Sequence, residues 1–471
     1  MARVYFDTNV FSNLKSNVNS KFQGLNEKLN LYKESFSFVF SPAHIRDKQN
    51  DSTEKKFEDF DFIETIVGDN HISYSILTHE TSFYPATPRM VFDDLAKEKN
   101  FLENFWDLTS ENEDVNQLKA SILEKTSQQI VPIDLSKFHE QSEEQKNFMS
   151  MIIPTEKDVI TLKDIMLKTT EYIRQMLSNS GNVYKQTRDI IGEGLKLHAF
   201  INEHIDVNKF LENGSLTSDF WEYIKTKVGE QKVDYSDYDL YLFAYSALDF
   251  FGINKDGISK KNGYRNIFND SLHSYYAKFC DYLITDDKGL SQKSKALFES
   301  LGIQTKVLSV QDFIDLLHEG GEVAEKTLTE FLNKFSRNII NVDAKSKKKL
   351  SNEYLIISPK ERLLNFFDDA AEIRNGKDVY FLLKRKNMHS LSKLNYGEIE
   401  IVINKCIQLL GKDKFSYGRF DRESEIDEIR NGKWRNRLWG DDPYILLRYP
   451  HNGEFCLIFG PFNNVYAENY Q

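Results

Sequence analysis

Cysteine and proline are both scarce in this chain of 471 residues, which contains three cysteines and nine prolines. Cys280, Cys406 and Cys456 have neither the C-x-x-C spacing of a zinc site nor the even number that a disulfide framework needs. We therefore expect buried thiols in a reducing cytosol. The chain also lacks a run of about 18 apolar residues and a charged-then-apolar leader, so we expect a cytoplasmic protein with no membrane span.

Positive charge is in deficit as well, with 61 Lys and Arg against 72 Asp and Glu and a formal net charge of −11. This balance argues against a protein that simply coats nucleic acid. The excess of acid falls within the first 330 residues, whereas residues 331–471 are mildly basic. Such a division is compatible with an acidic catalytic part joined to a part that holds the substrate.

The first ten residues contain a short apolar run, Val4 to Phe6, which stops abruptly at Asp7, Thr8 and Asn9. A buried parallel strand is typically a continuous hydrophobic run, and α/β sheets bind ligands just beyond the carboxyl ends of such strands. We therefore expect Asp7 at the edge of a sheet. The alternative is a structural role, because these residue types also favour turns and helix N-caps.

Three further segments place a carboxylate near the end of a predicted strand. The apolar run from Cys280 to Ile284 leads into Thr285 and Asp287. Asp270 lies on a predicted helix just upstream, and Asp47 follows the predicted strand over residues 36–40. Because the strands of a parallel sheet end at one edge, four acids from distant segments are predicted to converge there.

This pattern resembles the PIN-domain nuclease family, whose motifs are a first-strand Asp-Thr-Asn, an acid after the second strand, a helix Asp and a strand ending in Thr-x-Asp. By position, Asp7, Asp47, Asp270 and Asp287 match the four acids in that order. Ala277 falls where the family keeps a small residue. The second acid of the family is usually Glu, so Asp47 departs from the pattern.

The resemblance covers residues 1–55 and 255–318, and it implies an α/β fold with a three-layer domain built on a parallel sheet. Residues 303–310 are predicted to form its final strand and residues 311–317 its closing helix. The roughly 200 residues between the matching parts, 56–254, are too long for a loop and are predicted to be a mostly helical insertion. The insertion has two alternative roles. It is either a lid or substrate platform over the site, or a structural or dimerisation lobe.

Residues 325–471 follow a Gly-Gly linker and are predicted to form a small α+β domain. Partner recognition and substrate holding are both open for it. Its predicted elements are a helix over 325–340, a strand Tyr354 to Ile357, a helix from Lys360, a strand Val379 to Lys384, a helix Tyr396 to Leu410, and a hairpin of Tyr444 to Arg448 with Glu454 to Phe459.

The resemblance implies hydrolysis of phosphodiester bonds with Mg²⁺ or Mn²⁺, which bind carboxylate oxygens and retain waters. Asp7 and Asp287 are expected to bind the principal ion. Asp270 and Asp47 are expected to hold it through water or to bind a second ion. The three polar residues Thr8, Asn9 and Thr285 are expected to orient the carboxylates.

Two histidines and several cations have two interpretations each. His44 and His273 each lie three positions from a candidate acid, so they either contact phosphate or orient the site, or they are ordinary helix-face residues paired with an acid. Lys288 either contacts phosphate or is a solvated charge. The basic run 345–349 binds a nucleic-acid backbone or is a solvated linker. The stretch 433–439, which alternates cations with aromatics, is either a base-stacking surface or the apolar underside of the terminal hairpin.

These patterns favour a metal-dependent endonuclease, and the resemblance favours RNA as its substrate, as in a toxin-like or defence ribonuclease. The alternatives are a nuclease of the same fold that cleaves DNA, or an inactive PIN-like RNA-binding scaffold. A regulatory protein partner could bind through residues 325–471. A hydrolase with Asp7 as the nucleophile is disfavoured, because that chemistry needs an Asp two positions on, where Asn9 stands.

Overall fold

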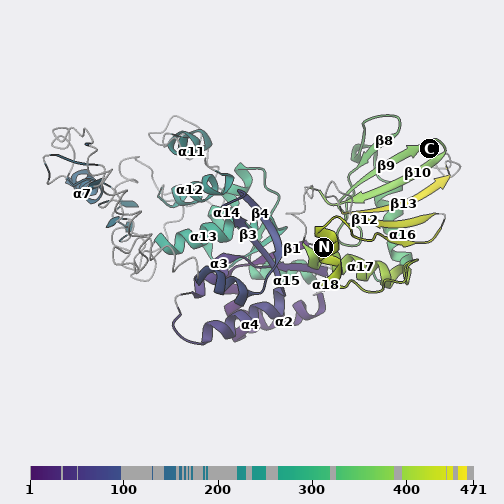
Figure 1. Ribbon diagram of the computed structural model, residues 1–471, viewed down its shortest axis with the longest axis horizontal. Helices are drawn as coiled ribbons and strands as arrows, with labels where there is room; N and C mark the ends of the chain where they lie inside the picture. The colour runs from purple at the N-terminus through teal and green to yellow at the C-terminus, as the bar shows by residue number, and fades with distance from the viewer. Residues whose placement is uncertain are drawn as a thin grey trace.

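The computed structural model describes residues 2–32, 35–49, 51–96, 264–318, 325–386, 395–441, 443–448 and 455–463. Between residues 97 and 263 it describes residues 130, 143–154, 220–229 and 236–250, with scattered residues from 157 to 188. Over these ranges the protein is a mixed α/β structure with one parallel and one large antiparallel sheet (Figure 1). Within them, no helix combines the length and apolar character that a bilayer crossing requires.

Four parallel strands form the first sheet, in the order β2-β1-β5-β6. Tyr5 in the centre of β1 pairs with Val39 on one side and with Leu283 on the other. The two ends of the predicted split domain therefore share one sheet, and all four strands end at the same edge. The strands are β1 (Ala2–Phe6), β2 (Phe36–Val39), β5 (Tyr282–Ile284) and β6 (Lys306–Leu308).

Helices cover both faces of this sheet, because alternate strand residues point to opposite sides. Tyr5 and Leu283 belong to one buried cluster, and Val4 and Ile284 belong to another. The first cluster includes α12 (Asp237–Phe250), α13 (Tyr264–Ala277) and α14 (Lys288–Ser300), and the second includes α1 (Thr8–Ser16), α2 (Ser20–Tyr32), α4 (Lys55–Val67) and α15 (Val310–His318). Helix α3 (Pro42–Lys48) follows β2 and contacts both.

A two-stranded hairpin, β3 (Asn70–Ser75) and β4 (Glu80–Pro85), lies in the region predicted to be mostly helical. Pro85 ends the strand, where its missing N–H is tolerated. The hairpin adjoins β2 through a parallel bridge between Phe40 and His71. The other described helices there are α7 (Glu143–Ile152) and α11 (Phe220–Gly229).

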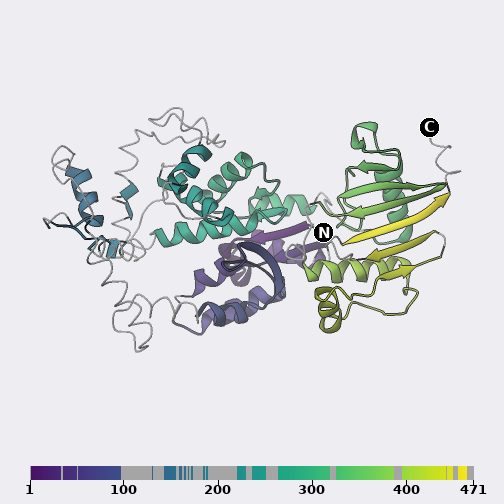
Figure 2. The same cartoon turned by 45° about the horizontal axis from the view of Figure 1, so that its top comes forward.

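The C-terminal part contains a seven-stranded antiparallel sheet in the order β11-β12-β13-β10-β9-β8-β7 (Figure 2). The predicted strand at 354–357, the helix at 396–410 and the terminal hairpin are confirmed. The strands are β7 (Lys347–Lys349), β8 (Tyr354–Ile357), β9 (Asp369–Asn375), β10 (Asp378–Lys384), β11 (Arg437–Trp439), β12 (Tyr444–Arg448) and β13 (Cys456–Asn463), and the helices are α16 (Leu328–Phe335), α17 (Tyr396–Leu410) and α18 (Arg422–Arg430).

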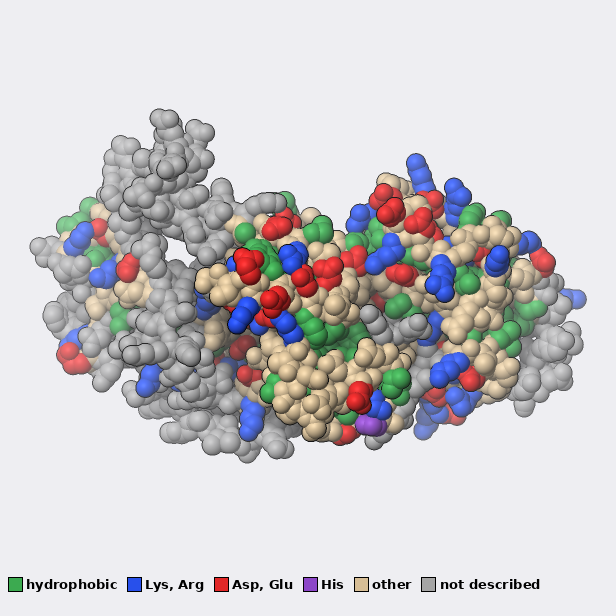
Figure 3. Space-filling view, turned by 90° about the horizontal axis from the view of Figure 1, so that it is seen from below, with side chains coloured by type: hydrophobic (Ala, Val, Ile, Leu, Met, Phe, Trp, Pro, Cys, Tyr) green, Lys and Arg blue, Asp and Glu red, His purple; other side chains and the backbone are tan. Residues whose placement is uncertain are grey.

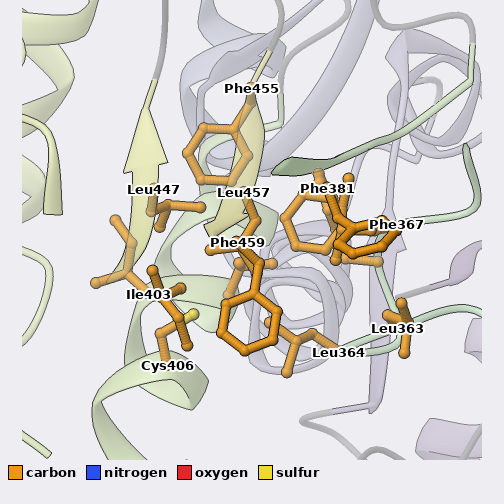
Figure 4. Packing of buried hydrophobic residues seen from close by; sticks show 14 of the residues in the cluster. Leu363, Leu364, Phe367, Phe381, Ile403, Cys406, Leu447, Phe455, Leu457 and Phe459 are labelled. Atoms are coloured by element: carbon orange, nitrogen blue, oxygen red, sulfur yellow. The ribbon is translucent and has the colours of Figure 1, made fainter. Parts of the chain in front are cut away.

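The helix predicted from Lys360 is absent, and the described residues 360–368 form a turn instead. The backbone N–H groups of Leu363 and Phe367 each donate to the other residue's carbonyl at 2.9 Å. Leu364 and Asn365 have positive φ angles of 50° and 55°. The side chains of Leu363, Leu364 and Phe367 are buried in the C-terminal core (Figure 4), which stabilises this left-handed turn over a helix.

This C-terminal core draws all its residues from the chain beyond residue 330. Cys406 lies within it beside Ile403 on α17 (Figure 4), and the other two cysteines are buried too, which confirms three buried thiols. The basic run 345–349 contributes the edge strand β7. In Figure 3, Lys and Arg are spread over the C-terminal part at the right among Asp and Glu, and the central part also carries both kinds of charge.

The C-terminal part contacts the amino-terminal edge of the parallel sheet through a buried ionic network. Arg3 of β1 donates from Nε and Nη2 to Glu398 at 2.8 Å and 2.6 Å. Arg385 donates to Glu398 at 2.6 Å and to Asp281 at 2.9 Å, and Arg362 also pairs with Asp281. Burial opposes the ionised form of Glu398, but the two arginines hold its pKa below the usual value. The candidate acids lie at the opposite edge of the sheet, where the strands end.

Candidate functional site

Asp7 directly follows β1 and caps α1. Its carboxylate accepts hydrogen bonds from Thr285 Oγ1 at 3.0 Å and from Asn9 Nδ2 at 3.4 Å. Asp7 and Thr285 are both buried, at the ends of the adjacent strands β1 and β5. The two predicted strand-end motifs therefore meet, and Thr285 and Asn9 both hydrogen-bond to Asp7.

Asp287 begins α14 and accepts a hydrogen bond from the Leu290 N–H at 2.8 Å. Its own N–H donates to Thr285 Oγ1 at 3.0 Å, so one hydroxyl links Asp7 with the turn that carries Asp287. Asp286 faces elsewhere: it accepts from the Val310 N–H at 3.1 Å and pairs with Lys21 at 2.5 Å. Lys288 is exposed.

Asp47, on α3, pairs with His273 on α13, with 2.9 Å between Asp47 Oδ2 and His273 Nε2. Asn269 Nδ2 donates to the other oxygen of Asp47, also at 2.9 Å. Nε2 of His273 lies 3.2 Å from Thr8 Oγ1, and Nδ1 lies 2.9 Å from the Tyr5 hydroxyl. The sequence spacing suggested Asp270 as the acid beside His273, but the structure pairs this histidine with the acid of another helix.

The surroundings of the Asp47–His273 pair favour the ionised form of Asp47 and the protonated form of His273. Burial disfavours charged His273, yet the hydrogen bond and charge of Asp47, with a contribution from Asp7, raise the pKa of His273 above its usual value. Burial likewise opposes charged Asp47, but the hydrogen bond and charge of His273, together with a hydrogen bond from Thr8, more than offset burial, so the pKa of Asp47 is lowered. In its protonated form the imidazole donates to Asp47 and to Tyr5, whose hydroxyl lies 2.6 Å from Ser41 Oγ.

His44 has a structural role in α3. Its Nδ1 accepts from the Ser41 N–H at 3.0 Å and completes a capping box, and its Nε2 lies 2.7 Å from the Phe6 carbonyl oxygen. Complete burial, with the nearby charge of His273, lowers the pKa of His44 to about 3. A neutral imidazole that donates from Nε2 satisfies both bonds. Of the two interpretations for His44, the helix-face residue therefore fits, with a backbone partner in place of an acid.

Asp270, on α13, shows that the four acids lie within electrostatic reach of one another. Burial raises the pKa of Asp270 well above its usual value, Asp287 raises it further, and Asp7 and Asp47 add to the effect, while Lys293 opposes them. Burial also raises the pKa of Asp7. The charge of His273 lowers this pKa, whereas the charges of Asp47 and Asp287 raise it further. The charges of the other acids thus oppose ionisation of both Asp270 and Asp7 at the carboxyl edge of the sheet.

In the described ranges, no group of three or more His, Cys, Asp or Glu side chains is arranged to hold a metal ion. The hydrogen bonds explain this arrangement, because Asp7 is tied to Thr285, Asp47 to His273, and Asp287 to the first turn of α14. The chemistry of the donors nevertheless suits Mg²⁺ or Mn²⁺, since all four are carboxylates. The raised pKa of Asp270 also marks a place where added positive charge would be stabilised.

Sequence reasoning missed the residues that α12 and α14 add to this edge. Tyr245 of α12 is fully buried, and its hydroxyl has no hydrogen-bond partner among the described residues. Burial, and then the charges of Asp270 and Asp287, raise the pKa of Tyr245 well above its usual value, so the hydroxyl lies near these acids. Lys293 of α14 is buried and donates to Asp249 of α12 at 2.6 Å. Only a helical period in the chain hinted at α12, and nothing in the sequence placed it over the acids.

Comparison with family models, with curated proteins and with solved structures found no match to this chain.

Proposed function

We propose that the protein is a metal-dependent endonuclease of PIN-like type, acting on RNA and using Asp7, Asp270 and Asp287 with Asp47. The observation that carries this proposal is the meeting of two strand-end motifs, in which Thr285 Oγ1 donates to Asp7 at 3.0 Å and accepts from the Asp287 N–H at 3.0 Å. Burial and the charges of the other three acids also disfavour the ionised form of Asp270 and raise its pKa. Carboxylates that repel one another weaken a fold, so their convergence from four segments favours a site that binds positive charge.

The polar groups around the acids suit this chemistry. A bound Mg²⁺ or Mn²⁺ would make a coordinated water nucleophilic and would neutralise the leaving oxygen. Asp270 would help to hold the ion, because a nearby cation offsets the charges that disfavour its ionised form. The buried Tyr245 hydroxyl, which has no partner among the described residues, is suited to donate a hydrogen bond to a water held by the acids.

The insertion proposed for residues 56–254 would then serve the site directly. Helix α12 brings Tyr245 and Asp249 to the acids, and it is fixed on α13 by a 2.6 Å hydrogen bond between Tyr241 and Ser274. Of the two roles left open for the insertion, this placement favours the substrate platform.

A cleavage assay tests the proposal. The protein and its Asp7→Asn and Asp287→Asn variants are incubated with end-labelled RNA, single-stranded DNA and duplex DNA, in Mn²⁺, in Mg²⁺ or in chelator. We expect metal-dependent cutting of RNA that both variants lose, by a factor of at least about 100, the scale on which positioned groups of this kind contribute. Cutting of DNA alone would identify DNA, and not RNA, as the substrate.

The second candidate is an inactive nucleic-acid-binding protein of the same fold. It is favoured by the pairing of Asp47 with His273 and by the lack, in the described ranges, of a ready metal-binding group. The same assay separates the two, because the inactive protein would bind RNA without cutting it in either metal.

A further inference from the structure

The stretch 433–439 had two interpretations, a base-stacking surface or the apolar underside of the terminal hairpin. In the structure both of its tryptophans are buried. Trp434 Nε1 donates to Glu425 at 2.8 Å, and Trp439 Nε1 donates to the Gly411 carbonyl at 2.9 Å. These two indoles belong to the core and are not available to stack on bases.

Two other aromatic rings lie exposed beside that stretch. The connection between α17 and α18 contains the aromatic loop, defined here as residues 412–419. In it Phe415 is 55% exposed and Tyr417 is 39% exposed. Their ring centres are 5.6 Å apart with an interplanar angle of 31°. A single exposed apolar side chain is ordinary, but two neighbouring rings held at such an angle form a stacking surface.

Buried charges fix the backbone that presents these rings. Asp413 accepts from the N–H groups of Phe415 and Tyr417 at 3.0 Å and 3.4 Å, and from Arg437 Nη1 at 3.0 Å. Arg437 also donates to the Gly418 carbonyl at 2.9 Å. A buried ion pair of this kind is weak evidence of a stabilising role, since apolar residues of the same volume often stabilise a fold equally well. Its clearest effect here is to hold the aromatic loop in one conformation.

Exposed cations lie on the aromatic loop and on the neighbouring stretch 433–435. The Arg435 guanidinium carbon lies 5.6 Å from the centre of the Tyr417 ring. Lys414 pairs with Asp441, and Arg435 is 3.8 Å from Glu428, so two acids oppose the group. The exposed cations are Lys412, Lys414, Arg419, Lys433 and Arg435. Three of them, Lys412, Lys414 and Arg419, belong to the aromatic loop itself, whose one acid, Asp413, is buried and paired with Arg437.

We propose that the aromatic loop, with Lys433 and Arg435, is a binding site for single-stranded nucleic acid. Unpaired bases stack on Phe415 and Tyr417 while the cations neutralise the neighbouring phosphates. A duplex hides its base faces and cannot make the stacking contacts. The inference rests on the proposed function, because it names a single-stranded nucleic acid as the substrate class of the nuclease. The site belongs to the C-terminal part, which contacts the sheet edge opposite the acids.

The test is fluorescence anisotropy with the full chain in chelator, so that binding is measured without cleavage. The probes are a labelled oligouridine, an oligothymidine of the same length and a DNA duplex. The Phe415→Leu/Tyr417→Leu variant keeps apolar bulk and removes both rings, and the Lys433→Gln/Arg435→Gln variant removes two charges. The matched control is Lys326→Gln/Lys377→Gln, which removes two exposed charges elsewhere on the C-terminal part.

We expect the wild type to prefer single strands and the Leu variant to bind them about 10- to 100-fold more weakly, the range for losing base stacking. The Gln variant should reduce the slope of log K against log salt by about 1.4, and the control should not. Binding by the wild type that the Leu variant retains, equal binding of duplex, or no binding of any probe would overturn the inference. After the last result, a protein would be the remaining candidate partner of the loop. Cleavage without this binding would contradict the binding site but not the proposed function. Binding without cleavage would contradict the proposed function but not the binding site.

Discussion

Replacing Asp270 with Asn tests whether the acids repel one another in the folded protein. The substitution keeps the shape of the side chain and removes its charge. Three carboxylates, those of Asp287, Asp7 and Asp47, raise the pKa of Asp270, and the ammonium of Lys293 lowers it. The neutral amide should therefore stabilise the metal-free protein.

The size of the effect follows from these charges. Two unit charges about 8 Å apart repel by roughly 2 kcal/mol at an effective dielectric constant of about 20. Three repulsions less one attraction leave roughly 4 kcal/mol, and protonation of Asp270 relieves part of this. We expect Asp270→Asn to raise the free energy of unfolding by about 1–3 kcal/mol, or the melting temperature by about 2 °C or more per kcal/mol.

The assay is differential scanning calorimetry near neutral pH in chelator, with Asp286→Asn as the matched control. Asp286 is a neighbouring acid that pairs with Lys21 and is 38% exposed, so its loss should lower stability by only about 0–1 kcal/mol. In saturating Mn²⁺ the order should change, because the ion would stabilise the wild type more than Asp270→Asn. If Asp270→Asn melts below the wild type in chelator, the acids do not repel one another and the reasoning fails.

Two further predictions concern pH and the ionic network. The pKa of Asp7 is raised in the folded state, so the stability tied to its protonated form is present below the unfolded pKa of about 3.9 and is lost as pH rises through the folded pKa. Asp7→Asn should therefore flatten the fall in metal-free melting temperature as pH rises from about 3.9 through the folded pKa; an unchanged profile would contradict the raised pKa. Glu398→Gln leaves the buried Arg3 and Arg385 without their shared carboxylate and should cost about 3–5 kcal/mol in urea unfolding, whereas a loss below about 1 kcal/mol would show that the network contributes little.

Much of the parallel domain could be predicted from the sequence, because its signals are local. Val4 to Phe6 is apolar without interruption and is followed by a capping Asp7, and Tyr282 to Ile284 repeats the pattern before Asp287. The segments that carry Asp7, Asp47, Asp270 and Asp287 were all assigned to the correct kind of element.

The partners of those residues could not be predicted, because they come from distant segments. His273 has Asp270 on its own helix and yet bonds to Asp47, which sits 226 positions away in the chain. Tyr245 and Lys293 reach the acids only through the packing of α12 against α14. No single stretch of sequence contains that information.

The C-terminal part was predicted less completely for a different reason. Strand β9 (Asp369–Asn375) and helix α18 (Arg422–Arg430) are rich in charge, so their apolar periods are weak. The turn at Leu363 to Phe367 is apolar enough to suggest a helix, but its apolar side chains are buried by a left-handed turn. Tertiary burial decided the backbone there.

The central claim is that the carboxylates at the carboxyl edge of the parallel sheet act together on a phosphodiester. The most direct measurement is single-turnover cleavage of end-labelled RNA in Mn²⁺ by the wild type, Asp270→Asn and Asp286→Asn side by side. The account predicts that Asp270→Asn loses cleavage by at least about 100-fold while it melts higher in chelator, and that Asp286→Asn cuts like the wild type. Equal cleavage by all three proteins, or none by the wild type, would contradict it.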